Sequence, residues 1–148
     1  MTAVVVLVVA LTLAIAVGLW VRRREGAVRS SEAGASSGPR TDLLRTVGVT
    51  EGTVTVLHFS ATWCGPCAAV RRVASSVVND LAAAGRNVAD VEVDVDEHPA
   101  LAKEFGVMSL PTTFVLDGSI QERFRASGVP SAADLRDAVS DAGGPAGS

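Results

Sequence analysis

The two cysteines of this 148-residue chain lie three positions apart, in the segment WCGPC at residues 63–67. A secreted disulfide scaffold carries more cysteines at wider spacing. A closed zinc site needs four ligands, and the only histidines, His58 and His98, are too far apart in the chain to complete one with Cys64 and Cys67. The pair therefore predicts a redox-active dithiol that needs no metal and no organic cofactor.

Cys64 is expected to be the nucleophile of this dithiol. The strand-like run TVTVLHFS at residues 53–60 precedes it, and a run with helical spacing follows. The partial positive charge of a helix N-terminus favours a thiolate at that position. Cys67, one turn further, is expected to lie deeper and to resolve a mixed disulfide on Cys64. Pro66 suits a first helical turn, where no N–H is needed, and Gly65 leaves the approach to sulfur open.

Alternating strands and helices are predicted around this pair from the hydrophobic pattern and the turn residues. Helices are expected at residues 41–47, 64–84, 99–105 and 131–142, and strands at residues 53–60, 88–96, 112–116 and 120–125. The order is strand, helix, strand, helix, hairpin, helix. It predicts an α/β fold in which a mixed β-sheet is flanked by helices on both faces.

The first 24 residues are predicted to be a transmembrane anchor. Residues 3–21 contain no charge, and as a helix they would span about 28 Å, close to the thickness of a bilayer core. Trp20 suits the membrane interface, and arginines at 22–24 follow directly. The positive-inside rule then places the rest of the chain in the cytoplasm, as a single-pass membrane protein. A cleaved signal peptide stays an alternative because residues 14–16, AIA, resemble a cleavage triplet.

The domain boundaries follow from composition. Residues 25–39 are rich in Ser, Gly and Pro and are predicted to be a flexible linker, and residues 144–148 a disordered tail. This leaves residues 40–143 as the folded domain. From residue 41 onward the chain carries 8 Lys and Arg residues against 14 Asp and Glu residues. An acidic domain argues against nucleic-acid binding, which needs a basic face.

The segment WCGPC resembles the dithiol motif of the thioredoxin family. The segments FSATW, VDVD, FGV and LPT, at residues 59–63, 93–96, 105–107 and 110–112, are similar to further segments of that family, so the resemblance covers residues 40–142. It implies a thioredoxin-like fold and a thiol–disulfide oxidoreductase. It also implies protein disulfides as substrates and a thiol reductant as partner, either a thioredoxin reductase-like protein or a transmembrane donor.

The same resemblance implies a substrate groove beside the dithiol. Pro111 is expected to be cis and to pack against Cys64, and the backbone of Ser109 and Leu110 to pair with an extended substrate strand. Trp63, Met108 and Gly128 are expected at the rim, with ordinary packing as the alternative for Met108. The full set of expected substrate-binding residues is Trp63, Gly65, Pro66, Met108, Ser109, Leu110, Pro111 and Gly128.

Four positions depart from the family pattern: His58, Glu92, Ser60, which replaces a common aromatic, and Arg72, which replaces a usual proline. The family usually has an aspartate on the strand before the dithiol and often a lysine on the third strand, where this chain has His58 and Glu92. We expect His58 and Glu92 to form a charge-swapped pair beneath Cys67 and to act in proton transfer. The alternative is that His58 packs under the sheet against a backbone carbonyl while Glu92 points to water.

The sequence as a whole predicts a membrane-tethered protein disulfide reductase. Two alternatives stay open. One is an extracytoplasmic enzyme that forms or rearranges disulfides instead of reducing them, that is, an oxidant or isomerase. The other is a membrane-anchored adaptor that holds a partner in the groove around Pro111 while the dithiol stays idle.

Overall fold

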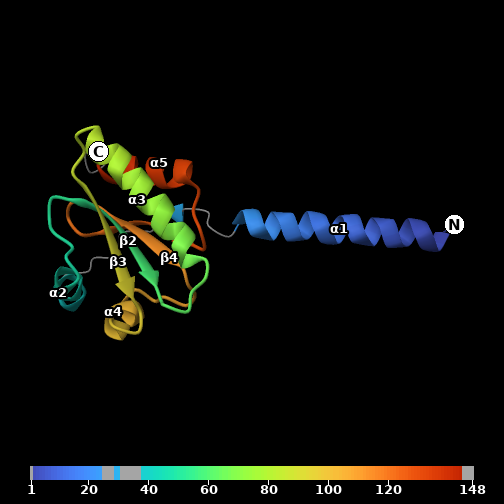
Figure 1. The fold of residues 1–148 in the computed structure, drawn as a ribbon, viewed down its shortest axis with the longest axis horizontal. Helices are drawn as coiled ribbons and strands as arrows, with labels where there is room; N and C mark the ends of the chain where they lie inside the picture. The colour runs from blue at the N-terminus through green and yellow to red at the C-terminus, as the bar shows by residue number, and fades with distance from the viewer. Residues whose placement is uncertain (1, 25–28, 31–37, 145–148) are drawn as a thin grey trace.

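The computed structural model describes residues 2–24, 29–30 and 38–144. Most of the predicted linker, residues 25–39, and the tail beyond residue 144 lie outside these ranges. The elements, labelled in Figure 1, are α1 (Thr2–Arg24), β1 (Arg29–Ser30), α2 (Pro39–Thr46), β2 (Val54–Ser60), α3 (Cys67–Ala83), β3 (Val88–Asp94), α4 (Pro99–Glu104), β4 (Thr112–Leu116), β5 (Glu122–Ser127) and α5 (Ala132–Ala142).

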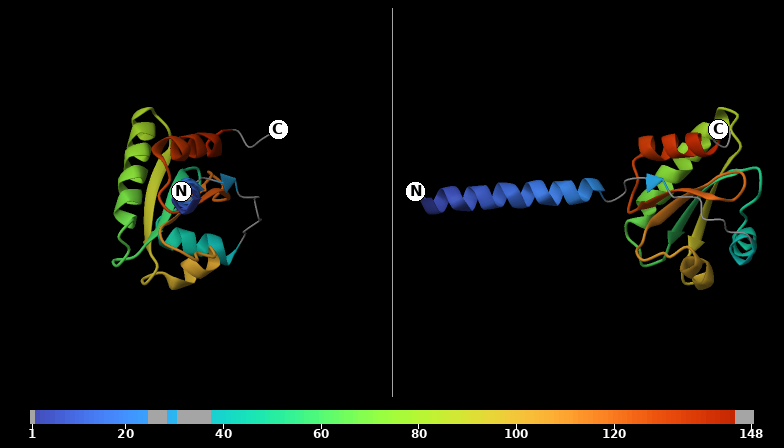
Figure 2. Two further views of the ribbon diagram at one scale, coloured as in Figure 1. Left: turned by 90° about the vertical axis from the view of Figure 1, so that its right-hand side faces the viewer. Right: turned by 180° about the vertical axis from the view of Figure 1, so that it is seen from behind.

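The sheet is mixed, as predicted. Its strand order is β1-β5-β4-β2-β3, with β2 parallel to β3 and antiparallel to β4. Helices α3 and α5 cover one face, and α2 and α4 lie on the other (Figures 1 and 2). The α/β architecture expected from the sequence, a mixed sheet flanked by helices on both faces, is confirmed for the folded domain.

Side chains of β2 alternate between two separate cores because successive residues of a strand point to opposite faces. On the α2 and α4 face, the ring centroid of Phe59 lies 5.7 Å from those of Phe105 and Phe114, which are themselves 4.8 Å apart. On the other face, Val54 and Val56 pack against apolar residues of α3 and α5. All seven residues of β2 are buried, as expected for an interior strand covered on both faces.

Several elements differ from the sequence-based expectation. Helix α3 begins at Cys67 rather than residue 64, because the preceding residues form a turn in which the Cys67 amide donates to the Cys64 carbonyl at 3.3 Å. The hairpin strand β5 begins at Glu122, after a turn whose Asp117 carboxylate accepts two backbone N–H bonds. Strand β1 was not expected, since two residues are too few to show any periodicity.

Helix α1 covers the apolar N-terminal run, and its side chains are described from Val5 to Leu19. The large apolar side chains in that stretch are each 50–68% exposed. Among the described residues, no helix combines the length and apolar character needed to cross a membrane.

Ser131 caps α5 as expected: its hydroxyl oxygen accepts a hydrogen bond from the Asp134 amide at 3.1 Å. Because this bond satisfies an amide that has no partner within the helix, Ser131→Ala should lower the free energy of unfolding by about 1 kcal/mol in chemical denaturation. Ser119→Ala is the control, since Ser119 contributes backbone atoms to its turn and these survive the substitution. Equal stabilities of the two variants would contradict the capping assignment.

Candidate active site

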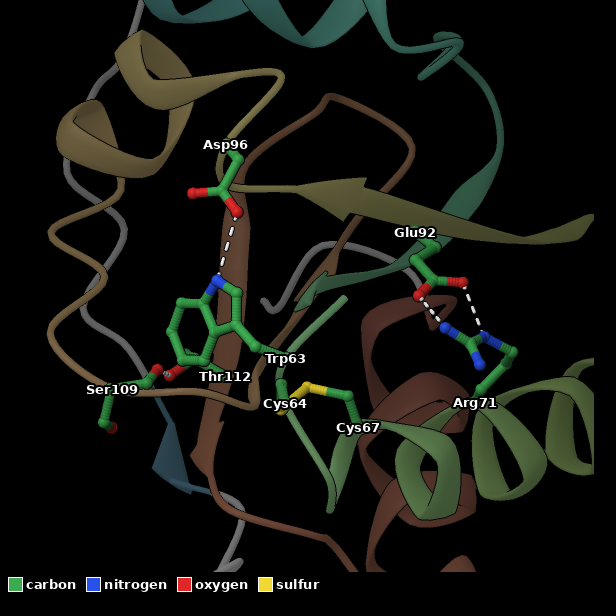
Figure 3. Close-up of a disulfide and its surroundings, with 8 residues drawn as sticks. All are labelled: Trp63, Cys64, Cys67, Arg71, Glu92, Asp96, Ser109 and Thr112. Atoms are coloured by element: carbon green, nitrogen blue, oxygen red, sulfur yellow. Dashed lines mark hydrogen bonds and ion pairs between the residues drawn. A yellow bond between two sulfur atoms is a disulfide. The ribbon is translucent and has the colours of Figure 1, made fainter. Parts of the chain in front are cut away.

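Cys64 and Cys67 form a disulfide bond, with their Cα atoms 5.5 Å apart, between the end of β2 and the start of α3 (Figure 3). The two residues are unequally accessible. Cys67 is 2% exposed and packs beneath the first turn of α3, whereas Cys64 is half-buried in the turn that precedes the helix. The dithiol therefore has an outer sulfur and an inner sulfur, as its spacing predicted.

The chain places Cys64 at the surface because β2 ends one residue before Ala61. The Cys64 amide donates to the Ala61 carbonyl at 3.1 Å. This turn leads the backbone out of the sheet, and α3 begins three residues later at Cys67. Pro66 occupies the N-cap position of that helix, and both Gly65 and Pro66 are exposed. Cys64 thus lies in front of a helix N-terminus, where the helix dipole favours negative charge.

The segment before β4 lies at the end of the sheet where β2 ends. Phe59 pairs in register with Thr112, so the residues just before Thr112 lie beside the end of β2. The Leu110–Pro111 peptide bond is cis, as expected, and Pro111 is buried. The Gly128 amide donates to the Pro111 carbonyl at 2.8 Å with Gly128 at φ +84°, a conformation that favours glycine.

The residues expected at the rim of a groove are largely exposed. Trp63 is 70% exposed and Met108 is 94% exposed, so Met108 is not a packing residue. Ser109 is exposed, and its carbonyl accepts a hydrogen bond from the Thr112 hydroxyl at 2.7 Å. Together with Val129, Trp63 and Met108 are the exposed large hydrophobic side chains in the described part of the domain. All three come from segments that adjoin the dithiol or Pro111.

Two residues of this surface were missed by the sequence analysis. Val129 follows Gly128 directly and is 37% exposed. Asp96 accepts a hydrogen bond from the Trp63 indole N–H at 3.1 Å, which orients the ring beside Cys64 (Figure 3). The contact joins two segments 33 positions apart, so no local pattern of residues could have indicated it.

His58 and Glu92 pair differently from the sequence-based expectation, and only His58 is buried, since Glu92 is exposed on β3. His58 is 1% exposed, and its Nε2 atom lies 3.1 Å from Oδ1 of Asp90. Glu92 instead forms a two-bond ion pair with the Arg71 guanidinium, in which Nε donates to Oε2 at 2.8 Å (Figure 3). The expected His58–Glu92 pair is therefore corrected. The two residues are neighbours in the β2–β3 register, but Glu92 is paired with Arg71, and His58 lies against Asp90.

The Arg71 contact changes the acidity of Glu92. Hydrogen bonding to Arg71 is the largest cause that lowers the pKa of Glu92 to about 2, with the Ser60 hydroxyl and the nearby His58 contributing in the same direction and burial opposing it. Glu92 is thus a fixed negative charge throughout the neutral pH range.

Comparison with known proteins places this arrangement in a family. The model of the family described as Thioredoxin matches residues 46–141, which include the dithiol, helix α3 and Pro111. The chain belongs to the thioredoxin family. This membership agrees with the sequence motifs and with the sheet order described above.

Individual thioredoxins show how far the similarity extends. Thioredoxin from Staphylococcus aureus is 42% identical over 66 residues, which cover 44% of this chain and 60% of that protein. Among solved structures, chloroplastic thioredoxin z is 25% identical with a TM-score of 0.56, covering 77% of this chain and 96% of its own. Mitochondrial thioredoxin 3 from Saccharomyces cerevisiae, in its oxidized form, is 27% identical with a TM-score of 0.54, covering 68% and 88%.

The Arg71–Glu92 pair should make part of the stability of this thioredoxin-family domain depend on pH. Because the folded-state pKa of Glu92 is lowered from 4.5 to about 2, the pair stabilises the fold fully above pH 4.5 and is lost as the pH falls through 2. Arg71→Ala should raise the pKa of Glu92 toward 4.5 in a carboxyl-carbon NMR titration. The stability difference from wild type should shrink over the same pH range.

Arg72→Ala is the matched control, since Arg72 is an exposed arginine on the same helix and makes no ion pair among the described contacts. A Glu92 pKa that stays near 2 in Arg71→Ala would show that another group depresses it.

Proposed function

We propose that this chain is a thiol–disulfide oxidoreductase that reduces protein disulfides with the Cys64–Cys67 dithiol and is tethered to a membrane by its N-terminal helix. The observation that carries the proposal is the unequal burial of two bonded sulfurs beside an exposed apolar rim. An accessible sulfur can attack a substrate, and a buried sulfur three residues away can displace it.

The reaction follows from these two positions. The Cys64 thiolate attacks one sulfur of a substrate disulfide, forming a mixed disulfide and releasing the other substrate sulfur as a thiolate. The Cys67 thiolate then attacks the Cys64 sulfur, forming the Cys64–Cys67 bond and releasing the second substrate sulfur. The substrate disulfide gains two electrons and the dithiol loses two. A thiol reductant, of the thioredoxin reductase type or a transmembrane donor, returns the pair to the dithiol form.

Recognition of a protein substrate is supported by the surface around the outer sulfur. Trp63, Met108 and Val129 provide apolar contacts of the kind that protein interfaces use. The exposed backbone at Ser109 and the half-buried Leu110 lie beside the start of β4, where an extended substrate segment can pair by β-addition. No cofactor is required for exchange between thiols and disulfides.

Membrane attachment is supported by the sequence of the N-terminal segment. Residues 3–21 lack charge, and the arginines at 22–24 follow them. The helix assigned there, α1, has apolar side chains that are exposed throughout the part described. We place the catalytic domain on the cytoplasmic side because positive charge is concentrated on the C-terminal side of the run.

The assignment of the nucleophile is tested by alkylation. Limiting iodoacetamide at pH 7 should label Cys64 first in the reduced protein, because Cys64 is the accessible sulfur at the helix start. Reduction of insulin should be lost in Cys64→Ser, whereas Cys67→Ser should accumulate a mixed disulfide on Cys64, detected by mass spectrometry. Faster labelling of Cys67 would reverse the assignment. Retained insulin reduction in Cys64→Ser would refute the proposed reaction.

The orientation is tested with a membrane-impermeant maleimide on intact cells that express the full chain. After treatment with a permeant reductant, Cys64 should stay unlabelled in intact cells and become labelled once the cells are permeabilised. The mature protein should keep residues 1–24 by intact mass. Labelling in intact cells would place the domain outside the cytoplasm, and loss of the N-terminal segment would identify it as a signal peptide.

A further inference from the structure

The rim beside the dithiol carries a sulfur atom that takes no part in thiol–disulfide exchange. The chain has two methionines, of which Met1 is the first residue and Met108 belongs to the folded domain. Met108 is 94% exposed, the highest value among the large hydrophobic side chains of the described residues. An oxidant in solution therefore reaches the Met108 thioether without any opening of the fold.

The backbone that carries Met108 is held on both sides. The Val107 amide donates to the Ala102 carbonyl at 3.0 Å, and the Ser109 carbonyl accepts a hydrogen bond from the Thr112 hydroxyl at 2.7 Å. The Met108 side chain itself belongs to neither hydrophobic core. A change in its polarity therefore alters the surface of the domain and leaves its packing intact.

This side chain lies where a protein substrate is expected to dock. Phe59, near the end of β2, pairs in register with Thr112, and Ser109, the neighbour of Met108, lies at the same end of the sheet as Trp63 and Cys64 (Figure 3). A methionine suits such a surface because its flexible, apolar thioether adapts to the shape of the partner. The polarity of Met108 should therefore affect the affinity for protein substrates.

The state of the dithiol decides when Met108 is the sulfur at risk. The susceptibility of sulfur to oxidation follows its thiolate character and its exposure, so in the reduced protein Cys64 reacts first and the pair closes to the disulfide. In the structure described here, Cys64 and Cys67 are already bonded to each other, and neither is a thiolate. Met108 is then the exposed sulfur of the described domain that has not yet been oxidised.

We propose that Met108 is a redox modification site, whose conversion to the sulfoxide by a hydroperoxide weakens the docking of protein substrates beside Cys64. The thioether sulfur attacks one oxygen of hydrogen peroxide, an S–O bond forms as the O–O bond breaks, and the leaving hydroxide takes up the proton of the transferred oxygen to become water. The sulfur loses two electrons and the peroxide gains two. The product is a polar side chain in place of an apolar contact. This inference rests on the proposed function, because it concerns substrate recognition at the same site.

The modification is tested first, on the full chain in detergent and in its disulfide form. Hydrogen peroxide, removed afterwards with catalase, should add one oxygen atom at Met108, located by peptide mapping that separates Met108 from Met1. The rate should lie within about twofold of that of a short methionine peptide, because the exposed thioether has no protection. A rate about tenfold lower would show a protected thioether and would overturn the inference.

The effect on recognition is measured after the cysteines are reduced again with dithiothreitol, with the sulfoxide still present by mass. The KM for insulin should rise by about 3- to 10-fold, the effect of losing one contact at an interface. The rate with hydroxyethyl disulfide should not change, since this small substrate reaches Cys64 without docking across the rim. Treatment with a methionine sulfoxide reductase should restore the original KM.

Two variants separate the thioether from other targets of peroxide. Met108→Leu stays apolar but has no thioether, so its KM for insulin should be the same before and after peroxide. Met108→Gln is polar from the start, and its KM for insulin should exceed that of Met108→Leu without any oxidant. Both variants are compared with themselves in hydroxyethyl disulfide reduction, which reports on the dithiol alone.

The outcomes distinguish this inference from the proposed function. An unchanged KM for insulin in the chain with Met108 sulfoxide would overturn the inference, while the dithiol reaction stands. Equal losses on peroxide treatment in wild type and Met108→Leu would assign the damage to other residues and would also overturn the inference. Failure of the untreated wild-type chain to reduce insulin would overturn the proposed function, and the inference with it.

Discussion

The pairing of β2 with its two neighbours is the constraint on which the candidate site depends. All seven residues of β2 are buried, and the strand is hydrogen-bonded to β3 on one side and β4 on the other. Its end therefore cannot shift without disrupting both ladders and both cores. Cys64 follows from that end, and Pro111 precedes the start of the antiparallel neighbour β4. The β2–β4 register thus brings the dithiol and the Pro111 segment together at one end of these two strands.

The same strand carries three buried polar side chains, Thr55, His58 and Ser60. His58 stands between Val56 and Ser60 on the face below α3, where burying a polar group costs free energy unless it is paired. Oδ1 of Asp90 lies 3.1 Å from Nε2 of His58 and partly offsets that cost. Glu92, the register partner of His58 on β3, is paired with Arg71.

The opposite face of the domain is held by a different kind of contact. The guanidinium carbon of Arg40 lies 3.8 Å from the ring centroid of Phe105, and Arg40 also forms an ion pair with Glu122 at 2.8 Å. These contacts tie the start of α2 to β5 and to the cluster of three phenylalanines. The face that carries no dithiol chemistry is therefore packed with aromatic and cation–π contacts, while the face below α3 keeps a titratable group in its interior.

The sequence by itself determined the order of the elements, the dithiol and the segment with the cis proline. The element order and the dithiol have local causes: the β-branched run of β2, the cap at Ser131 and the spacing of two cysteines. The cis bond at Pro111 was expected from the resemblance to the family. It also distinguished an accessible Cys64 from a buried Cys67, because one helical turn separates them. The start of α3 was misplaced by three residues, since the turn at Cys64 depends on backbone hydrogen bonds that composition does not reveal.

Only the tertiary structure decided which charged groups meet. From the sequence, Glu92 was the expected partner of His58, and the two are in fact neighbours in the register. Yet the partner of Glu92 comes from α3, whose rotation over the sheet sets where Arg71 points, and the partner of His58 is Asp90, two residues away on the same face. Likewise, the bond from Trp63 to Asp96 joins two separate loops. Contacts between side chains on different elements depend on how those elements pack, and no local pattern of residues encodes that geometry.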